Sequence, residues 1–188
     1  PLAACTLSKE FFGGMFGPLV LLYLVRDVGF SPGVLGSIFA VGGVSSLLGA
    51  MAVVPLARRF GRGASMIIGL LLFSGALFLI PMAQGPTLLA AALLVLQQIA
   101  GDGAATVYHV NLVSFRQESA PEALLGRVNA SSEFLTLGAG LAGSLASGIA
   151  GEWIGVRATL FIGAAGTLFS VLLLIGSPVR RLTAERAR

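Results

Sequence analysis

The sequence has little charge. Only 11% of its 188 residues are Asp, Glu, Lys or Arg, whereas about 25% is usual for a soluble domain. Hydrophobic residues make up 56% of the chain. So few charges cannot cover a hydrophobic core with a polar shell in water, so most of the surface is expected to contact lipid. The sequence therefore predicts an integral membrane protein with the lipid bilayer as a partner.

Other absences exclude further classes. Cys5 is the single cysteine, so no intramolecular disulfide is possible. There is no metal-ligand cluster and no nucleotide-binding loop, so neither a cofactor nor ATP-driven transport is expected. An intramembrane serine protease would need a Gly-x-Ser-Gly motif, and the nearest strings, around Ser74 and Ser147, lack the first glycine. An enzyme is therefore not expected.

The placement of the basic residues argues against nucleic acid as a partner, although the net charge is +4. They lie in short clusters between apolar runs, with no basic stripe and no interleaved aromatic residues. The chain begins at Pro1 without a signal peptide, and we interpret it as a piece of a longer protein.

Six apolar runs are long enough to cross about 30 Å of hydrocarbon, which takes about 20 residues. The breaks between them contain Gly, Pro and charged residues, which are typical of turns. The predicted fold is an all-α bundle of six transmembrane helices over residues 1–179, with a basic tail at 180–188. The expected spans are residues 2–25, 33–57, 64–83, 87–114, 126–150 and 158–177.

Basic residues are distributed unevenly between the two ends of these spans. Nine lie on the side of the second and fourth connections and the C-terminal tail, and two lie on the other side. The rule that positive loops stay inside predicts that both ends of this segment are cytoplasmic. The expected location is the plasma membrane, in a bacterium the inner membrane. The nine are Arg58, Arg59, Arg62, Arg116, Arg127, Arg180, Arg181, Arg186 and Arg188; the two are Arg26 and Arg157.

The six spans form two sets of three with matching character, which predicts a 3+3 inverted repeat. Spans one and four hold the polar residues and should line a pathway. Spans two and five are rich in Gly and Ser, as in Gly140-xxx-Ser144-xxx-Gly148, and should make close helix contacts. Spans three and six are uncharged and suit a lipid-facing periphery. The alternative is that the matching character is not a repeat, because any membrane bundle needs some helices rich in small residues and some rich in polar residues.

Two connections carry motifs of a known family. Residues 54–63, VPLARRFGRG, resemble the Gly-x-Leu-Ala-Asp-Arg-x-Gly-Arg-Arg loop of the major facilitator superfamily, and depart from it at Val54, Arg58 and Gly63. Residues 116–130 resemble the loop between helices ten and eleven in the efflux branch of enterobactin and macrolide exporters. Residues 23–27 and 31–36 resemble the corner between helices seven and eight of that branch.

The resemblance covers nearly the whole chain, as helices seven to twelve of a twelve-helix transporter. It implies alternating access around a cavity lined by spans one and four, a small amphiphilic substrate of drug, macrolide or siderophore type, and a proton gradient as energy source. It also implies a missing N-terminal six-helix half as partner. A scaffold or sensor derived from a transporter half is the alternative. The resemblance implies a cytoplasmic gate at Arg58, Arg59, Gly61, Arg62, Arg116, Gln117, Pro121, Gly126 and Arg127.

Lys9 and Glu10 are the charged candidates for the pathway in span one. A charge at the centre of a span costs about 2.5–3.5 kcal/mol on insertion scales, so a retained pair indicates a function. Adjacent residues on a helix point about 100° apart, so the two are not expected to face one partner together. We expect Lys9 to pair with Asp102 and Glu10 to carry the proton. Alternatively, both charges lie at the cytoplasmic interface.

Span four carries a polar stripe near mid-depth. Gln98, Asp102, Thr106 and His109 fall within a narrow arc at about 100° per residue, which predicts a water-accessible path. The alternative is internal hydrogen bonding, with His109 as a structural residue.

Span one is interrupted around Gly14, Gly17 and Pro18. Pro18 cannot donate to the Gly14 carbonyl, which bends the helix and indicates either a gating hinge or a static kink. Ser119 and Glu122 resemble a capping box, so the fifth helix is expected to start near residue 120. Glu133 would then enter the membrane near the gate arginines.

Overall fold

The computed structural model describes residues 2–119, 121 and 124–177, and six of its helical segments are long and apolar enough to cross a membrane. The predicted fold class is confirmed. The basic tail at 180–188 lies outside the described residues. The first span comprises α1 (Leu2–Gly14), α2 (Phe16–Leu22) and the π-turn η1 (Tyr23–Asp27), and the second span is α3 (Pro32–Phe60). The third span comprises α4 (Arg62–Leu77) and α5 (Leu79–Met82), and the fourth comprises α6 (Leu88–Gln97), the π-turn η2 (Gln98–Asp102) and α7 (Gly103–Ser119). The fifth span is α8 (Leu125–Ile154) and the sixth is α9 (Val156–Ile175).

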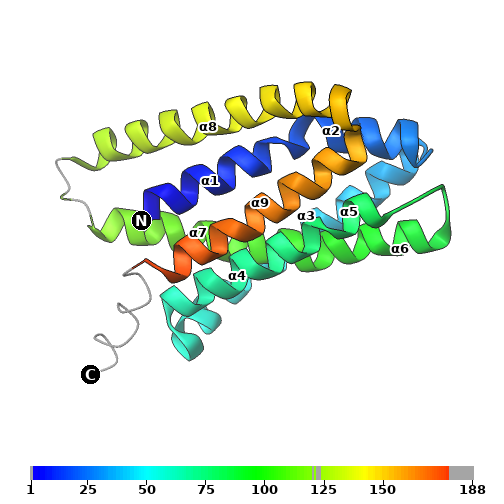
Figure 1. Ribbon diagram of the computed structural model, residues 1–188. Coiled ribbons are helices and arrows are strands. Elements are labelled where there is room, and N and C mark those ends of the chain that lie inside the picture. Colours follow the sequence, from blue (N-terminus) through cyan, green and yellow to red (C-terminus); the bar gives the residue numbers. More distant parts are fainter. Residues whose placement is uncertain (1, 120, 122–123, 178–188) are drawn as a thin grey trace.

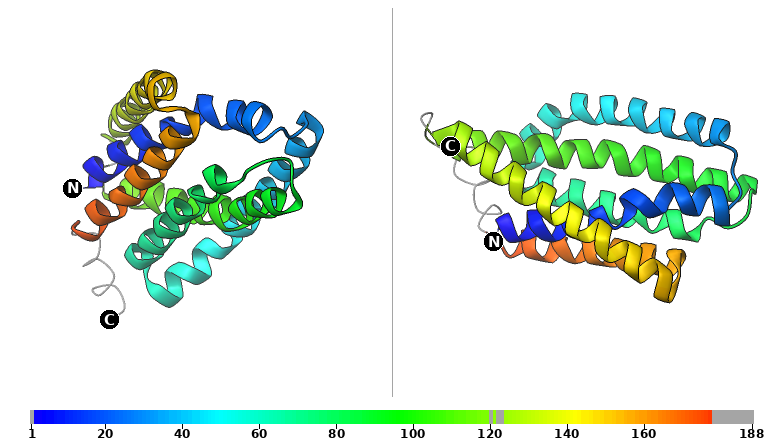
Figure 2. Two further views of the ribbon diagram at one scale, coloured as in Figure 1. Left: turned by 45° about the vertical axis from the view of Figure 1, so that its right-hand side comes forward. Right: turned by 90° about the horizontal axis from the view of Figure 1, so that it is seen from above.

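The helices run up and down in one bundle, with the second and fourth connections at one end and the odd connections at the other (Figure 1). The first span packs on α8 and α9, and the fourth packs on α3 and α4. Each polar span is therefore held by the other two spans of the opposite set. Helix α8 lies on the outside of the bundle against α1 (Figure 2).

Two glycine corners show the repeat in the backbone. Gly61 joins α3 to α4 with φ +82° and ψ 156°, and Gly155 joins α8 to α9 with φ +86° and ψ 153°. Positive φ favours glycine because a Cβ would be crowded. One turn later a hydroxyl donates back to each corner carbonyl, from Ser65 over 2.8 Å and from Thr159 over 2.9 Å. The same corner therefore connects the second and third helices of both sets.

Close backbone contacts repeat in the same way. Four glycines leave no room for a relaxed Cβ against a backbone carbonyl of the polar span beside them, as expected where helices approach through small residues. The contacts are Gly49 on Gly103, Gly143 on Phe11, Gly69 on Ala104 and Gly163 on Phe12. The first two and the last two are equivalent pairs, so the close packing predicted for spans two and five is confirmed and extends to spans three and six.

The third and sixth spans are not peripheral, contrary to the sequence prediction. Buried residues make up 50% and 44% of their most apolar 18 residues, against 28% and 11% in the second and fifth spans. Helices α4 and α9 contact each other as well as the polar spans. Bulky apolar side chains fit equally well against lipid or protein, so their composition does not distinguish the two positions.

The first span breaks between α1 and α2, one turn before Pro18. Pro18 has no N–H for the Gly14 carbonyl, and Ser144 of α8 donates to that carbonyl over 2.9 Å. Gly14 also packs directly on Gly140. Gly17 has ordinary space around it, with Ser144 Oγ 4.0 Å from an added Cβ. The freed backbone group predicted at Gly14 is therefore satisfied by the neighbouring helix.

The fourth span contains a break that the sequence does not predict. In a regular helix the Gly103 N–H would donate to the Ile99 carbonyl. Here the Ser45 hydroxyl of α3 lies between them, accepting from Gly103 N over 3.1 Å and donating to Ile99 O over 2.6 Å. The inserted hydroxyl accounts for the π-turn η2, because a side chain that enters the hydrogen-bond ladder distorts the helix.

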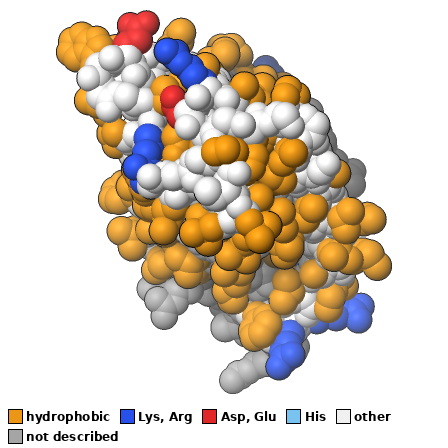
Figure 3. Space-filling view, turned by 90° about the vertical axis from the view of Figure 1, so that its right-hand side faces the viewer, with side chains coloured by type: hydrophobic (Ala, Val, Ile, Leu, Met, Phe, Trp, Pro, Cys, Tyr) orange, Lys and Arg blue, Asp and Glu red, His pale blue; other side chains and the backbone are white. Residues whose placement is uncertain are grey.

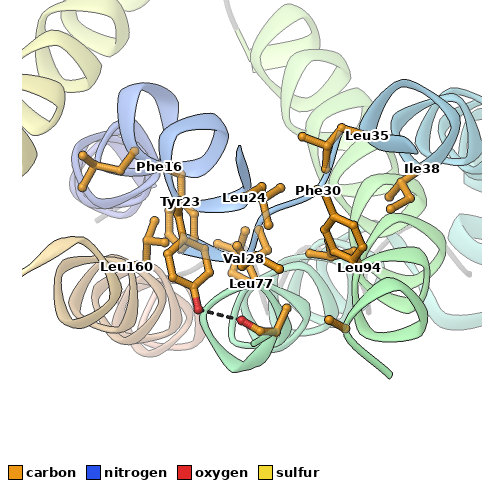
Figure 4. Close-up of a cluster of buried hydrophobic side chains, with 14 of the residues drawn as sticks. Phe16, Tyr23, Leu24, Val28, Phe30, Leu35, Ile38, Leu77, Leu94 and Leu160 are labelled. Carbon is orange, nitrogen blue, oxygen red and sulfur yellow. Dashed lines mark hydrogen bonds between the residues drawn. The ribbon is translucent and has the colours of Figure 1, made fainter. Parts of the chain in front are cut away.

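The end with the odd connections is closed by an apolar cluster (Figure 4). Leu24, Leu35 and Leu160 are almost fully buried in it. The Tyr23 hydroxyl donates to the Ala83 carbonyl over 2.7 Å, and Arg157 Nε donates to the Pro81 carbonyl over 2.8 Å. Figure 3 faces this end, where hydrophobic side chains cover most of the surface and charged side chains are few. These contacts join the first, third and sixth spans at this end of the bundle.

The fifth helix starts later than predicted. Ser119 is the last residue of α7 and α8 begins at Leu125, so the capping-box interpretation of Ser119 is wrong. Glu122 lies outside the described residues. Helix α7 continues beyond the apolar run and ends at Ser119, so Ser119 is not the residue that precedes the fifth helix.

Candidate functional site

A groove of about 620 Å³ lies between α1, α7 and α8. It gathers charged and titratable residues from three helices: Lys9 and Glu10 of α1, His109 and Arg116 of α7, and Glu133 of α8. Gly14 and Gly17, from the break in the first span, line the same groove. The two polar spans therefore contribute side chains to one groove.

Lys9 and Glu10 form an ion pair with each other, with Nζ 2.7 Å from Oε1. The expected pairing of Lys9 with Asp102 is therefore wrong in this conformation. Although adjacent residues leave the helix about 100° apart, the long lysine side chain spans the difference. The ammonium also lies 5.9 Å from the ring centroids of both Phe73 and Tyr108, within cation–π range.

Gln98 and Asp102 lie in a different place from His109. They line a smaller cavity of about 160 Å³ toward α3, where both approach the backbone of Gly42. The Thr106 hydroxyl bonds within its own helix, to the Asp102 carbonyl over 2.9 Å. The predicted continuous stripe is therefore wrong, because the π-turn η2 changes the angular position of the residues before it relative to those after it.

Glu10 and Asp102 nevertheless hold equivalent positions in the two sets of spans. Glu10 directly precedes Phe11, and Asp102 directly precedes Gly103. Phe11 and Gly103 are the residues on which Gly143 and Gly49 pack. Each polar span thus carries one carboxylate at the same position of the inverted repeat.

This arrangement was compared with known families. A model of the Major Facilitator Superfamily matches residues 2–188. The chain belongs to the major facilitator superfamily. Comparison with curated proteins gives no match. As a major facilitator protein the chain is a multi-pass membrane transporter, in agreement with its six apolar helices.

The second connection of this major facilitator chain is tied to the fourth span by an ion pair between Arg62 and Glu118, both about half exposed. Arg59 lies over the ring of Phe60, 5.4 Å from its centroid. Gly61 forms the positive-φ corner. Of these three features, the ion pair is the one that joins two helices, α4 and α7.

The other residues of the predicted gate lie at the end of α3, at the end of α7 and around the start of α8. Arg58, Gln117 and Pro121 are exposed, and so are Gly126 and Arg127 in the first turn of α8. Arg116 and Glu133 line the groove together. Within the described residues the structure gives Glu133 no ion pair.

Sequence reasoning missed several residues of the facilitator site. Phe73 and Tyr108 flank the Lys9 ammonium, and Ser45 and Ser144 satisfy the backbone at the two helix breaks. All four come from helices other than the one they contact, so local patterns carry no signal for the two aromatic residues. The two serines lie one turn from Gly49 and Gly140, and this spacing predicts a close helix contact but not the hydrogen bond.

Proposed function

We propose that this chain is the C-terminal half, helices seven to twelve, of a secondary transporter that exports small amphiphilic compounds in exchange for protons by alternating access. The observation that carries the proposal is the groove lined by Lys9, Glu10, His109 and Arg116 from the two polar spans and by Glu133 from α8. Charges inside a membrane mark substrate and proton pathways because they are costly anywhere else.

The exposed faces of α3 and α8 can contact lipid or protein, and the resemblance to twelve-helix transporters favours a second six-helix half as partner. Both helices have few buried residues, and both expose large side chains such as Leu47, Met51, Leu141 and Leu145. In the inverted-repeat arrangement of secondary transporters the pathway lies at the interface of the repeats. The N-terminal half would close the pathway from the opposite side.

Transport by the full-length protein tests this proposal. In liposomes with an imposed pH gradient, we expect ethidium to accumulate against its concentration gradient. Glu10→Gln should remove the dependence on the pH gradient, because the amide cannot take up and release the proton. Its folded yield is measured beside the wild type, because the Lys9 ammonium then lacks its carboxylate. Glu152→Gln, at the exposed far end of α8, should transport like the wild type. Gradient-driven accumulation by Glu10→Gln would overturn the role of Glu10.

Cysteine labelling tests the orientation. In a Cys5→Ala background we expect Gln84→Cys to react with a membrane-impermeant maleimide added to intact cells and Gln117→Cys to react only after the membrane is opened. Both side chains are exposed, at opposite ends of the bundle. The excess of basic residues at the second and fourth connections gives this direction. The reverse labelling pattern would place the termini of this segment outside.

A further inference from the structure

The cavity that contains Asp102 is built differently from the groove around Glu10. It lies between the first, second, third and fourth spans and holds about 160 Å³. Its polar lining is Gln97, Gln98 and Asp102. The other lining side chains are hydrophobic, and the aromatic ones are Phe16, Phe39 and Phe73.

The Asp102 carboxylate has no cation of its own in the described part of the chain. The ion pairs there are Lys9 with Glu10 and Arg62 with Glu118. Asp102 lies near the middle of the 31-residue span Leu88–Glu118, where an unpaired charge costs about 2.5–3.5 kcal/mol. A carboxylate at this depth requires a counter-ion from elsewhere if it is to stay charged.

The amide of Gln98 lies beside this carboxylate. Gln98 is only 6% exposed. Its Nε2 and the Asp102 Oδ2 both approach Gly42 so closely that a Cβ there would overlap them. Glycine at position 42 therefore keeps the space in which the two polar groups meet.

The equivalent carboxylate shows which cation suits this position. Glu10 is neutralised by the ammonium of the preceding residue, Lys9, and two aromatic rings flank that ammonium. The residue before Asp102 is Gly101, where an added Cβ would lie 2.9 Å from Gln97 Nε2 and 3.3 Å from the Ala76 Cβ. The fourth span therefore has neither a lysine nor space for one at this position.

We propose that the cavity binds the ammonium group of a lipophilic organic cation, with the Asp102 carboxylate as its counter-ion. The aromatic rings suit such a cation through cation–π contacts. A hard metal ion would need six or more oxygen ligands, which this apolar lining does not offer. The proposal rests on the proposed transport function, for which it names the substrate class.

Direct binding to the full-length protein in lipid nanodiscs tests the cavity. We expect radiolabelled phenethylammonium to bind and its neutral analogue 2-phenylethanol not to displace it. Asp102→Asn should weaken phenethylammonium binding about tenfold or more, because it removes one member of a buried charge pair. Gly42→Ala should weaken it as well, because the methyl group takes the space of the carboxylate.

Gly43→Ala is the matched control, because a Cβ at Gly43 meets nothing within 4 Å. It should bind like the wild type, and thermal unfolding of each variant shows whether the bundle is intact. The proposal is overturned if Asp102→Asn binds phenethylammonium like the wild type, if Gly42→Ala and Gly43→Ala behave alike, or if 2-phenylethanol competes equally well.

The two proposals fail in different ways. Binding that depends on Asp102, without ethidium accumulation in liposomes, supports the cavity and contradicts the transport proposal. Proton-driven ethidium accumulation that Asp102→Asn leaves unchanged, together with unchanged phenethylammonium binding, contradicts the cavity and leaves the transport proposal intact.

Discussion

Replacing Gly143 with valine is expected to prevent α8 from packing on the first span and to abolish the folded protein. A Cβ at Gly143 would overlap the backbone carbonyl of Phe11. Backbone cannot move aside as a side chain can, so the two helices would have to separate. Overpacking in cores costs about 1–3 kcal/mol and occasionally more, and a clash with backbone belongs at the upper end. Size-exclusion chromatography of a fluorescent fusion would show loss of the monodisperse peak.

The same helix supplies the control. Gly148 lies on the exposed side of α8, and an added Cβ there meets nothing within 4 Å. Gly148→Val should keep the monodisperse peak and the melting temperature of the wild type. If Gly143→Val and Gly148→Val were equally stable, the close contact between α1 and α8 would not be part of the fold in the membrane.

Replacing Lys9 with alanine is expected to reduce the folded protein strongly and to abolish transport. The substitution leaves Glu10 without the ammonium that lies 2.7 Å from its carboxylate. An uncompensated charge inside the membrane costs about 2.5–3.5 kcal/mol. The yield of folded protein and ethidium accumulation in liposomes measure the two effects separately.

The second substitution decides which carboxylate is the partner. Lys9→Ala with Glu10→Ala should recover most of the folded yield, because both charges are removed together. Lys9→Ala with Asp102→Ala should recover little of it. The opposite ranking would show that Lys9 pairs with Asp102 in the membrane and that the pair described for Glu10 is not the stabilising one.

The fold class is predictable from the sequence because it depends on composition and run length. Six apolar runs separated by Gly, Pro and Arg leave few alternatives to a helical bundle in a membrane. The break at Pro18 is predictable for the same kind of reason, since the missing N–H is a property of the residue itself.

The second break is not predictable from its own sequence. The π-turn at Gln98–Asp102 exists where the Ser45 hydroxyl enters from another helix. Extrapolating a regular helix through it placed Asp102 and His109 on one face. Likewise, the ring of Tyr108 beside Lys9 depends on how the fourth span crosses the first, which no local pattern encodes.

The two breaks differ in how permanent they are. Pro18 lacks a backbone N–H in every conformation, because this is a property of its covalent structure. The first span is therefore always bent near Gly14. The π-turn of the fourth span depends on one hydroxyl from Ser45. If that hydroxyl moves away, the Gly103 N–H can donate to the Ile99 carbonyl directly and the π-turn becomes a regular α-helical turn. A π-turn holds one residue more than an α-turn, so this change rotates Gln98 relative to His109 by about 100°. The bundle is therefore symmetric in its contacts but not in its mechanics, because the break near mid-span is fixed by a proline in one polar helix and held by a hydroxyl in the other.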